Sequence, residues 1–428
     1  MAENTNIGLR NQVMYSIYVR NYSKEGTFKA VEDDLDRIKN LGTDIIWLMP
    51  IHPIGTEARK GELGSPYAIQ DYRKVNPEFG TIDDFKSLVD AIHDRGMRCI
   101  IDVVYNHTSP DSWLAENYPE YFYKTPEGKM GNRVGDWVDI VDLDYNQKGL
   151  WDYQIQTLKM WAQIVDGFRC DVAPLVPLEF WKRARKEVEK VNSDCLWLSE
   201  SVESELIVDM RSKNMECLSD SEIFQAFDVC YDYDVFKYFR AYLRGECPLS
   251  WYIHHVNMQE YIYPANYVKL RYLENHDQDR AKAIIGSQSA LINWTAFIYF
   301  QKGITLIYAG QEKENDFRPD LFNKDTVSWD GSYDLSELLQ RLYLVKKKSI
   351  INDGSYSLRA VDEDDIIVGM YCAGNKKLIG IFNLKENCKK VEVDAKDGVY
   401  INILDGKDIT VENGMILSKE VPIIIEID

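Results

Sequence analysis

The sequence has no apolar run long enough to cross a membrane. A transmembrane helix needs roughly 18 or more consecutive apolar residues, and the apolar runs of this chain are far shorter. The first residues, MAENTNIGLRNQ, also lack the apolar segment of a secretion signal. We therefore expect no membrane partner and a cytoplasmic location, although a secreted chain whose signal has been removed would have the same sequence.

Cysteine patterns of metal sites are missing as well. The 8 cysteines form no C-x-x-C pair, which disfavours a zinc site or a redox-active pair. Cys99, Cys170 and Cys195 lie within apolar runs, where a free thiol packs as a small hydrophobic side chain. We expect the cysteines to be reduced and structural.

Positive charge is in deficit. The chain has 50 Lys and Arg residues against 69 Asp and Glu residues, which gives a net charge of −19. Because nucleic acids and anionic membranes attract basic surfaces, neither is expected as a partner. A neutral substrate fits this charge at least as well.

Short apolar runs typical of strands are present throughout the first 350 residues. They are rich in β-branched and aromatic residues and occur at 13–19, 44–50, 97–105, 164–172, 195–200, 267–274 and 303–309. A further strand around 223–231 would bring the number to eight.

Amphipathic helices are expected between most of these runs. In 27–42, apolar residues recur at helical spacing, Thr27 can cap the start and Gly42 can end the helix. The segment 81–96 has the same design with Thr81 as its cap. Strands alternating with helices indicate parallel βαβ units, and eight such units predict an α/β fold, a (β/α)8 TIM barrel.

Two segments depart from the barrel pattern. Residues 107–148 form a long, irregular connection after the third strand, which predicts a short inserted subdomain on the C-terminal rim. The barrel would then comprise 1–106 and 149–350. From 351 to 428 the chain reads as short strands split by polar turns, so we expect a C-terminal all-β sandwich domain.

Polar side chains gather where several expected strands end. In a (β/α)8 barrel the reactive side chains lie at the C-terminal ends of the strands. Four of the expected strands end in acidic or imidazole side chains, namely Asp102 with His107, Asp171, Glu200, and His276 with Asp277. A single aspartate at a strand end is often a helix cap, but the four positions together favour a functional site.

The run VDGFRCDVA carries an arginine and an aspartate inside an otherwise apolar strand. Since side chains alternate along a strand, Arg169 and Asp171 share one face, and Phe168, Cys170 and Val172 share the other. A buried ion pair is rarely the best route to stability. We expect both charged side chains to point into the open end of the barrel.

Four motifs in this order, DVVYNH, GFRCD, LSES and ENHDQD, resemble the conserved regions of the α-amylase family of glycoside hydrolases. GSPYAIQDY and GITLIYAGQE also resemble conserved stretches of that family, and the resemblance covers essentially the whole chain. It implies a retaining α-glycosidase that hydrolyses α-1,4-glucosidic bonds in starch-derived glucans or malto-oligosaccharides.

The resemblance also implies roles for the acidic residues. Asp171 corresponds to the nucleophile, Glu200 to the general acid and base, and Asp277 to a third carboxylate that binds sugar hydroxyls. We expect neighbouring carboxylates to raise the pKa of Glu200, and Arg169 to keep Asp171 ionised and oriented.

Further substrate contacts follow from the same resemblance. His107 and His276 are expected to donate hydrogen bonds to sugar hydroxyls, and Tyr67 to form an aromatic platform beneath the sugar ring. Arg280 is a further expected sugar contact. The 27 tyrosines and 10 tryptophans suit a sugar-binding protein, although most are expected in the core.

Two places where family members bind calcium lack the expected ligands. Asn106 is present, but the segment 172–175 offers no histidine, and the first loop, RNYSKEG, has no oxygen-rich ligand run. Because hard cations take about six oxygen ligands, we expect no essential metal and no cofactor. Asp102 and Asn106 are instead expected to hold loops.

Other functions fit the same motifs. A relative with this site can transfer the glycosyl unit to another sugar or cleave α-1,6 bonds, and an inactive binding subunit is a third alternative. Ala68 follows Tyr67 where exo-acting α-glucosidase relatives carry an aspartate, which disfavours that activity. The sequence leaves endo or exo action and the oligomeric state open.

Overall fold

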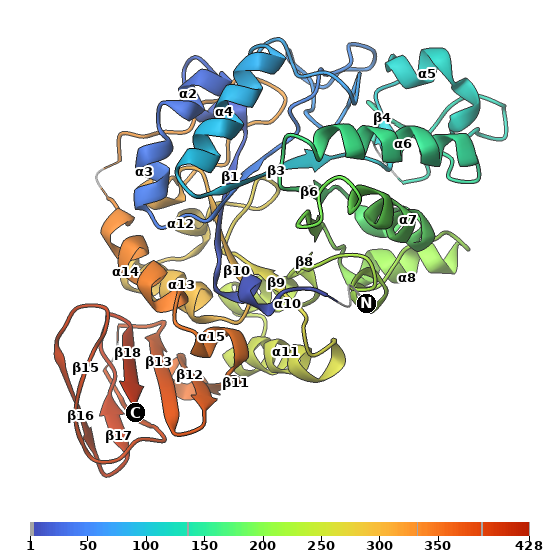
Figure 1. Cartoon of the computed structure of the whole chain (residues 1–428). Helices are drawn as coiled ribbons and strands as arrows, with labels where there is room; N and C mark the ends of the chain where they lie inside the picture. The colour runs from blue at the N-terminus through green and yellow to red at the C-terminus, as the bar shows by residue number, and fades with distance from the viewer. Residues whose placement is uncertain (1–3, 135–136, 332, 387, 428) are drawn as a thin grey trace.

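Eight parallel strands close into a barrel in the computed structural model, which describes residues 4–134, 137–331, 333–386 and 388–427 (Figure 1). The barrel order is β1-β10-β9-β8-β7-β6-β3-β2. The strands are β1 (Val13–Ile17), β2 (Ile45–Leu48), β3 (Arg98–Val103), β6 (Gly167–Cys170), β7 (Leu196–Ser199), β8 (Val229–Tyr231), β9 (Lys269–Arg271) and β10 (Ile304–Tyr308). The predicted (β/α)8 barrel is confirmed.

Helices surround the barrel and cover the outer face of its strands (Figure 1). The longer ones are α4 (Ile82–Asp94), α6 (Lys148–Trp161), α7 (Leu178–Val188), α8 (Ser204–Ser212), α10 (Tyr233–Leu243), α11 (Leu249–Ile262), α13 (Gln288–Phe300) and α14 (Ser336–Lys346). The shorter ones are α1 (Val19–Tyr22), α2 (Phe28–Glu32), α3 (Leu35–Asn40), α9 (Asp220–Ile223), α12 (Ala281–Ile284) and α15 (Ile350–Asp353). Among the residues described, no helix has the length and apolarity needed to span a bilayer.

The predicted cap of α4 is present. The Thr81 side chain accepts a hydrogen bond from the backbone N–H of Asp84, and the Asp84 side chain accepts one from the backbone N–H of Thr81. This reciprocal capping box satisfies two N–H groups that the helix leaves without partners. Gly96, with a φ of +65°, lies just beyond the end of the helix in the left-handed conformation that glycine adopts readily.

The single helix predicted over 27–42 is instead two short helices, α2 and α3. Thr27 caps α2 as expected, but the chain leaves the helical conformation at Asp34, whose φ and ψ are −104° and 2°. The Asp34 carboxylate accepts hydrogen bonds from Arg37 and Tyr22. Aspartate is a poor residue for a helix interior, and these contacts favour the break.

The inserted subdomain stands on the C-terminal end of β3. It contains β4 (His107–Thr108) paired antiparallel with β5 (Val141–Asp142), the helix α5 (Trp113–Asn117) and a 3-10 turn, η2 (Pro119–Tyr121). Pairing with β5 fixes β4 directly after the third barrel strand. His107, the first residue of β4, is thereby held at the mouth of the barrel.

The C-terminal domain consists of two antiparallel sheets beside the barrel, near α11, α13 and α15 (Figure 1). One sheet contains β11 (Ser355–Val361), β12 (Ile366–Ala373), β13 (Lys376–Asn383) and β18 (Ile423–Ile427), and the other β14 (Lys390–Glu392), β15 (Gly398–Ile401), β16 (Asp408–Glu412) and β17 (Met415–Leu417). Apolar residues from both sheets form a second core. The expected C-terminal β domain is confirmed.

Candidate active site

A cavity of about 390 Å³ opens among the C-terminal ends of the barrel strands and the loops that follow them. Most of the residues expected to form the site line it, namely Tyr67, His107, Asp171, Glu200 and Asp277. Lys60, Trp137, Asp139, Tyr233, Leu321 and Phe322 also line it. Sequence reasoning missed this second group because these residues lie on loops or at a helix start, where no periodic pattern marks their direction.

Arg169 connects the acidic residues of the cavity. Its guanidinium is fully buried, and Nη1 donates to Asp171 Oδ1 (2.9 Å) and Asp102 Oδ1 (3.0 Å). Nη2 lies 3.0 Å from Glu200 Oε1, but without the alignment of a hydrogen bond. Nε donates to the hydroxyl of Tyr231 at 3.2 Å. One cation therefore reduces the repulsion within a group of carboxyls.

Asp102 belongs to this group, although the sequence led us to expect that it holds a loop. It lies opposite Arg169 in the parallel register of β3 and β6, so the two side chains share a face of the barrel. Its Oδ2 also accepts a hydrogen bond from the Tyr67 hydroxyl (3.2 Å). The register of neighbouring strands is the signal that predicts this contact.

The chain turns sharply just after Asp171. The strand β6 ends at Cys170, and Val172 has a φ of +35°, a conformation that a β-branched residue rarely adopts. The expectation that Val172 continues the outward face of the strand is therefore wrong. The turn directs the Val172 N–H to Glu200 Oε2 at 2.8 Å, so local strain positions a donor on a candidate catalytic carboxyl.

Two of the carboxyls that contact the guanidinium, those of Asp171 and Glu200, differ in acidity. Burial raises the pKa of Glu200 to about 8, with further upward contributions from Asp171 and Asp277 and an opposing one from Arg169. Burial also raises the pKa of Asp171, to about 6, while Arg169 opposes this shift. Burial therefore raises the pKa of Glu200 more than the neighbouring carboxylates do, whereas the sequence led us to expect the carboxylates as the cause. Near pH 7, Asp171 is mainly ionised and Glu200 mainly protonated.

Asp277 lies on the more open side of the cavity, with a side chain that is 42% exposed. Although burial acts in the opposite direction, His276 and Arg169 lower the pKa of Asp277 to about 2. His276 Nε2 is 3.1 Å from Asp277 Oδ2 and 2.6 Å from the Tyr67 hydroxyl. The rings of Tyr67 and His276 are stacked, with centroids 5.5 Å apart. These contacts hold an ionised carboxylate at the rim.

His107 is a neutral hydrogen-bond donor. Burial lowers its pKa to about 4, and the side-chain amide of Asn106 donates to its Nδ1 at 3.1 Å. The hydrogen of the neutral ring is therefore on Nε2, which lies 4.0 Å from Asp171 Oδ2. This places an N–H group beside the candidate nucleophile.

Arg280 does not reach the cavity. Its buried guanidinium donates to Glu274 Oε1 (2.6 Å), to the carbonyl oxygen of Ala309 (2.9 Å) and to that of Phe317 (3.2 Å). All three nitrogen atoms are thus engaged with the segments after β9 and β10. Arg280 holds these loops, whereas the sequence led us to expect it in the cavity.

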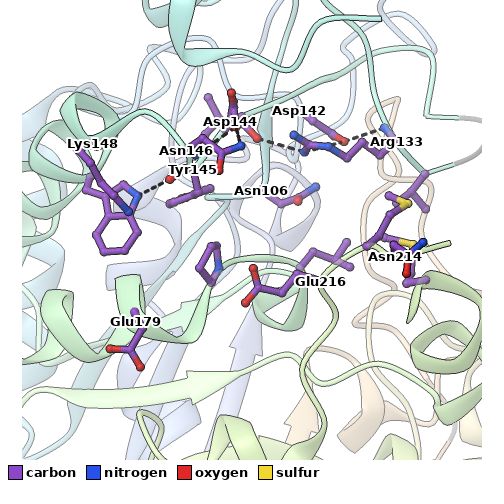
Figure 2. A pocket seen from close by; sticks show the side chains of 17 residues that line it. Asn106, Arg133, Asp142, Asp144, Tyr145, Asn146, Lys148, Glu179, Asn214 and Glu216 are labelled. Carbon is purple, nitrogen blue, oxygen red and sulfur yellow. Dashed lines mark hydrogen bonds and ion pairs between the residues drawn. The ribbon is translucent and has the colours of Figure 1, made fainter. Parts of the chain in front are cut away.

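A second cavity, of about 460 Å³, lies between the subdomain and the barrel, and Figure 2 shows the side chains that line it. Asn106 and Asp142 face it, but Arg133 lies beside Asp142, with Nη1 3.6 Å from Oδ2 and a backbone N–H donating to the same atom. In the part of the chain that the structure describes, no cluster of three or more His, Cys, Asp or Glu residues is suited to a metal ion. Arg133 therefore places a positive charge beside Asp142.

The chain matches two models of protein families. Residues 12–133 and 134–342 match the alpha amylase catalytic domain, and residues 357–425 match the bacterial alpha amylase C-terminal domain. The two matches together span the barrel and the sandwich.

The solved structures that resemble the whole chain include two alpha-amylases of more than 30% identity. An alpha-amylase from Lactobacillus plantarum is 46% identical, with a TM-score of 0.97 and coverage of 99% of this chain and 100% of that one. The maltogenic alpha-amylase AmyB from Thermotoga neapolitana is 33% identical, with a TM-score of 0.87 and coverage of 98% and 99%.

Curated relatives match over shorter stretches. Alpha-amylase MalA of Haloarcula japonica is 25% identical over 342 residues, which are 75% of this chain and 46% of that protein. An alpha-1,4-glucan:maltose-1-phosphate maltosyltransferase of Mycobacterium tuberculosis is 33% identical over 196 residues, 41% of this chain and 28% of that protein. The chain therefore spans less than half the length of these curated relatives.

We predict that chelation leaves the protein intact, because Arg133 already supplies positive charge beside Asp142. After dialysis against EDTA and removal of the chelator, the melting temperature and the activity should equal those of the untreated protein. Asp142 Oδ1 is buried without a hydrogen-bond partner, so it is the atom at which a bound cation would be expected. A fall in melting temperature that added Ca²⁺ restores would show that a cation binds there.

Proposed function

We propose that this chain, which belongs to the alpha-amylase family, is a retaining glycosidase. It hydrolyses α-1,4-glucosidic bonds in starch-derived glucans or malto-oligosaccharides. The observation that carries this proposal is a pair of carboxyls on one guanidinium, of which Glu200 has the higher pKa and Asp171 the lower one. Retaining glycosidases need one carboxylate as nucleophile and one carboxylic acid as proton donor.

In the first step, Asp171 attacks the anomeric carbon while Glu200 donates its proton to the departing glycosidic oxygen. The bond to the leaving sugar breaks, and a glycosyl ester forms on Asp171. Arg169 supports this step because its hydrogen bond to Asp171 Oδ1 (2.9 Å) stabilises the charged form of the nucleophile and fixes its direction.

In the second step, the ionised Glu200 accepts a proton from water as the water attacks the same carbon. The ester bond to Asp171 breaks, and the sugar leaves with its original configuration. The Val172 N–H, 2.8 Å from Glu200 Oε2, holds this carboxyl in place in both steps.

Other residues of the cavity bind the sugar whose bond is broken. Asp277, held ionised beside His276, accepts hydrogen bonds from sugar hydroxyls as positive charge develops on the ring. The Nε2–H of His107 is placed to donate to a hydroxyl near Asp171. Tyr67 contributes an aromatic face to the same cavity, on which the sugar ring stacks.

Transfer to a second sugar is the other candidate activity. It is favoured by the similarity of part of this chain to maltosyltransferases, at 33% identity over 196 residues. Both activities share the glycosyl ester on Asp171 and differ in whether water or a sugar hydroxyl attacks it. Cleavage of α-1,6 bonds would also use the same carboxyls.

Product analysis separates these activities. With maltoheptaose, we expect shorter malto-oligosaccharides and a steady rise in reducing ends, measured by chromatography and a reducing-sugar assay. Panose and pullulan serve as controls that contain α-1,6 bonds. Products longer than maltoheptaose without new reducing ends would instead identify a transferase, and preferential cleavage of panose or pullulan would identify an α-1,6-acting enzyme.

Isosteric replacement of the two carboxyls tests their roles. Glu200→Gln should lower kcat on maltoheptaose by about 10²–10⁴-fold, the usual contribution of a general acid or base, and Asp171→Asn should lower it at least as much. The melting temperatures should stay close to that of the wild type. Glu187→Gln, a change on the surface helix α7, is the matched control.

An activated substrate distinguishes the acid from the nucleophile. Maltosyl fluoride has a leaving group that needs little protonation, so Glu200→Gln should lose much less activity on it than on maltoheptaose. Asp171→Asn should be impaired on both substrates. Equal losses in both variants on both substrates, together with lower melting temperatures, would assign Asp171 and Glu200 a structural role instead.

A further inference from the structure

Three loops meet at one end of the active-site cavity. They are the loop after β2 (55–66), the subdomain segment just before β5 (137–140) and the loop after β10 (317–325). Lys60 of the first loop forms an ion pair with Asp139 of the second, with Nζ 2.8 Å from Oδ1. The same Nζ lies 5.8 Å from the ring centroid of Phe322 in the third loop. Lys60, Asp139 and Phe322 all line the cavity.

Backbone contacts hold the first and third loops together. The N–H of Leu63 donates to the carbonyl oxygen of Phe322 at 2.9 Å, and the N–H of Glu62 donates to Asn323 Oδ1 at 2.9 Å. At Gly61, a Cβ atom would lie only 2.7 Å from Cβ of Phe322. The two loops are therefore in direct contact, and no sugar chain passes between them.

The closed end adjoins His107 and Asp277. Trp137 packs against His107, with ring centroids 5.6 Å apart, and Arg318 of the third loop donates to the carbonyl oxygen of Asp277. His107 and Asp277 are the proposed ligands of the sugar that becomes attached to Asp171. The leaving group departs on the side of the proton donor, Glu200.

The ion pair between Lys60 and Asp139 is largely buried. The Asp139 side chain is only 4% exposed, whereas that of Lys60 is 33% exposed. Opening the pair would leave a buried carboxylate without its partner, which is unfavourable. Exposed ion pairs contribute little by comparison. The closed arrangement is therefore the favoured one.

We propose that the Lys60–Asp139 pair closes the glycone end of the cavity, so that the enzyme acts on the non-reducing ends of α-glucan chains and releases short malto-oligosaccharides. This inference rests on the proposed function. An enzyme that cuts within a chain needs a cleft open at both ends, because the polymer continues in both directions. The cavity volume of about 390 Å³ is near the low end of the ~300–1,000 Å³ of ligand pockets, as expected for a site that holds a chain end.

A pair of substrates tests the closed end. One is 4-nitrophenyl maltoheptaoside, and the other is the same compound with an ethylidene group bridging O4 and O6 of the non-reducing glucosyl unit. The block adds bulk only at the chain end that must enter the cavity. For the wild type, we expect kcat/KM on the blocked compound to be at least 10-fold lower. Equal values would overturn the inference, because they require an open glycone end.

Variants show whether the ion pair causes the selectivity. In the double variant Lys60→Ala/Asp139→Ala, we divide the kcat/KM of the blocked compound by that of the unblocked compound. This ratio should rise at least 10-fold over that of the wild type, and amylose should yield longer products. Removing both partners avoids an unpaired buried charge. Lys190→Ala/Glu187→Ala, which removes a partly exposed ion pair on the outside of the barrel, is the matched control and should keep the wild-type ratio.

The remaining outcomes are also decisive. If the double variant folds poorly, Asp139→Asn breaks the charge pair with almost no change of volume and should raise the same ratio. An unchanged ratio in a folded variant would overturn the role of the pair. If the wild type cleaves neither compound, the proposed hydrolase activity is wrong, and the inference fails with it.

Discussion

The site depends on a single buried guanidinium. Arg169 has no exposure to solvent, yet it contacts Asp102, Asp171 and Glu200 at the mouth of the barrel. Without this cation, burial would drive all of these carboxyls toward their protonated forms, because a low-dielectric environment disfavours charge. With it, burial still outweighs ion pairing, and the pKa values rise to about 6 for Asp171, about 7 for Asp102 and about 8 for Glu200. Asp171 has an aligned hydrogen bond from Nη1 and the lower pKa, whereas Glu200 lacks such a bond and has the higher one.

The barrel provides the geometry for these contacts. Neighbouring parallel strands place Asp102 opposite Arg169, and the turn after β6 directs the Val172 N–H to Glu200. The hydroxyl of Tyr231 on β8 accepts from Arg169 Nε, so three strands restrain one side chain. Residues of the subdomain and of the loops after β2 and β10 complete the lining of the cavity.

Sequence alone predicts the features that depend on local patterns. The alternation of strands and helices, the cap at Thr81 and the motif positions of Asp171 and Glu200 are readable because neighbours along the chain determine them. The break at Asp34, the position of Asp102 and the engagement of Arg280 by Glu274 are not, because they depend on partners that only the folded chain brings together. The Lys60–Asp139 pair joins two irregular loops 79 positions apart in the numbering, and no periodic pattern links such residues.

The most direct test of the central role of Arg169 and burial is the pH dependence of kcat/KM. The raised pKa values of Asp171 and Glu200 predict a bell-shaped profile. The rate should fall below pH about 6, as Asp171 becomes protonated, and above pH about 8, as Glu200 loses its proton. A profile in which the alkaline limb lies near the ordinary glutamate pKa of ~4.3 would contradict it, because Glu200 would then be ionised at neutral pH and unable to act as the proton donor.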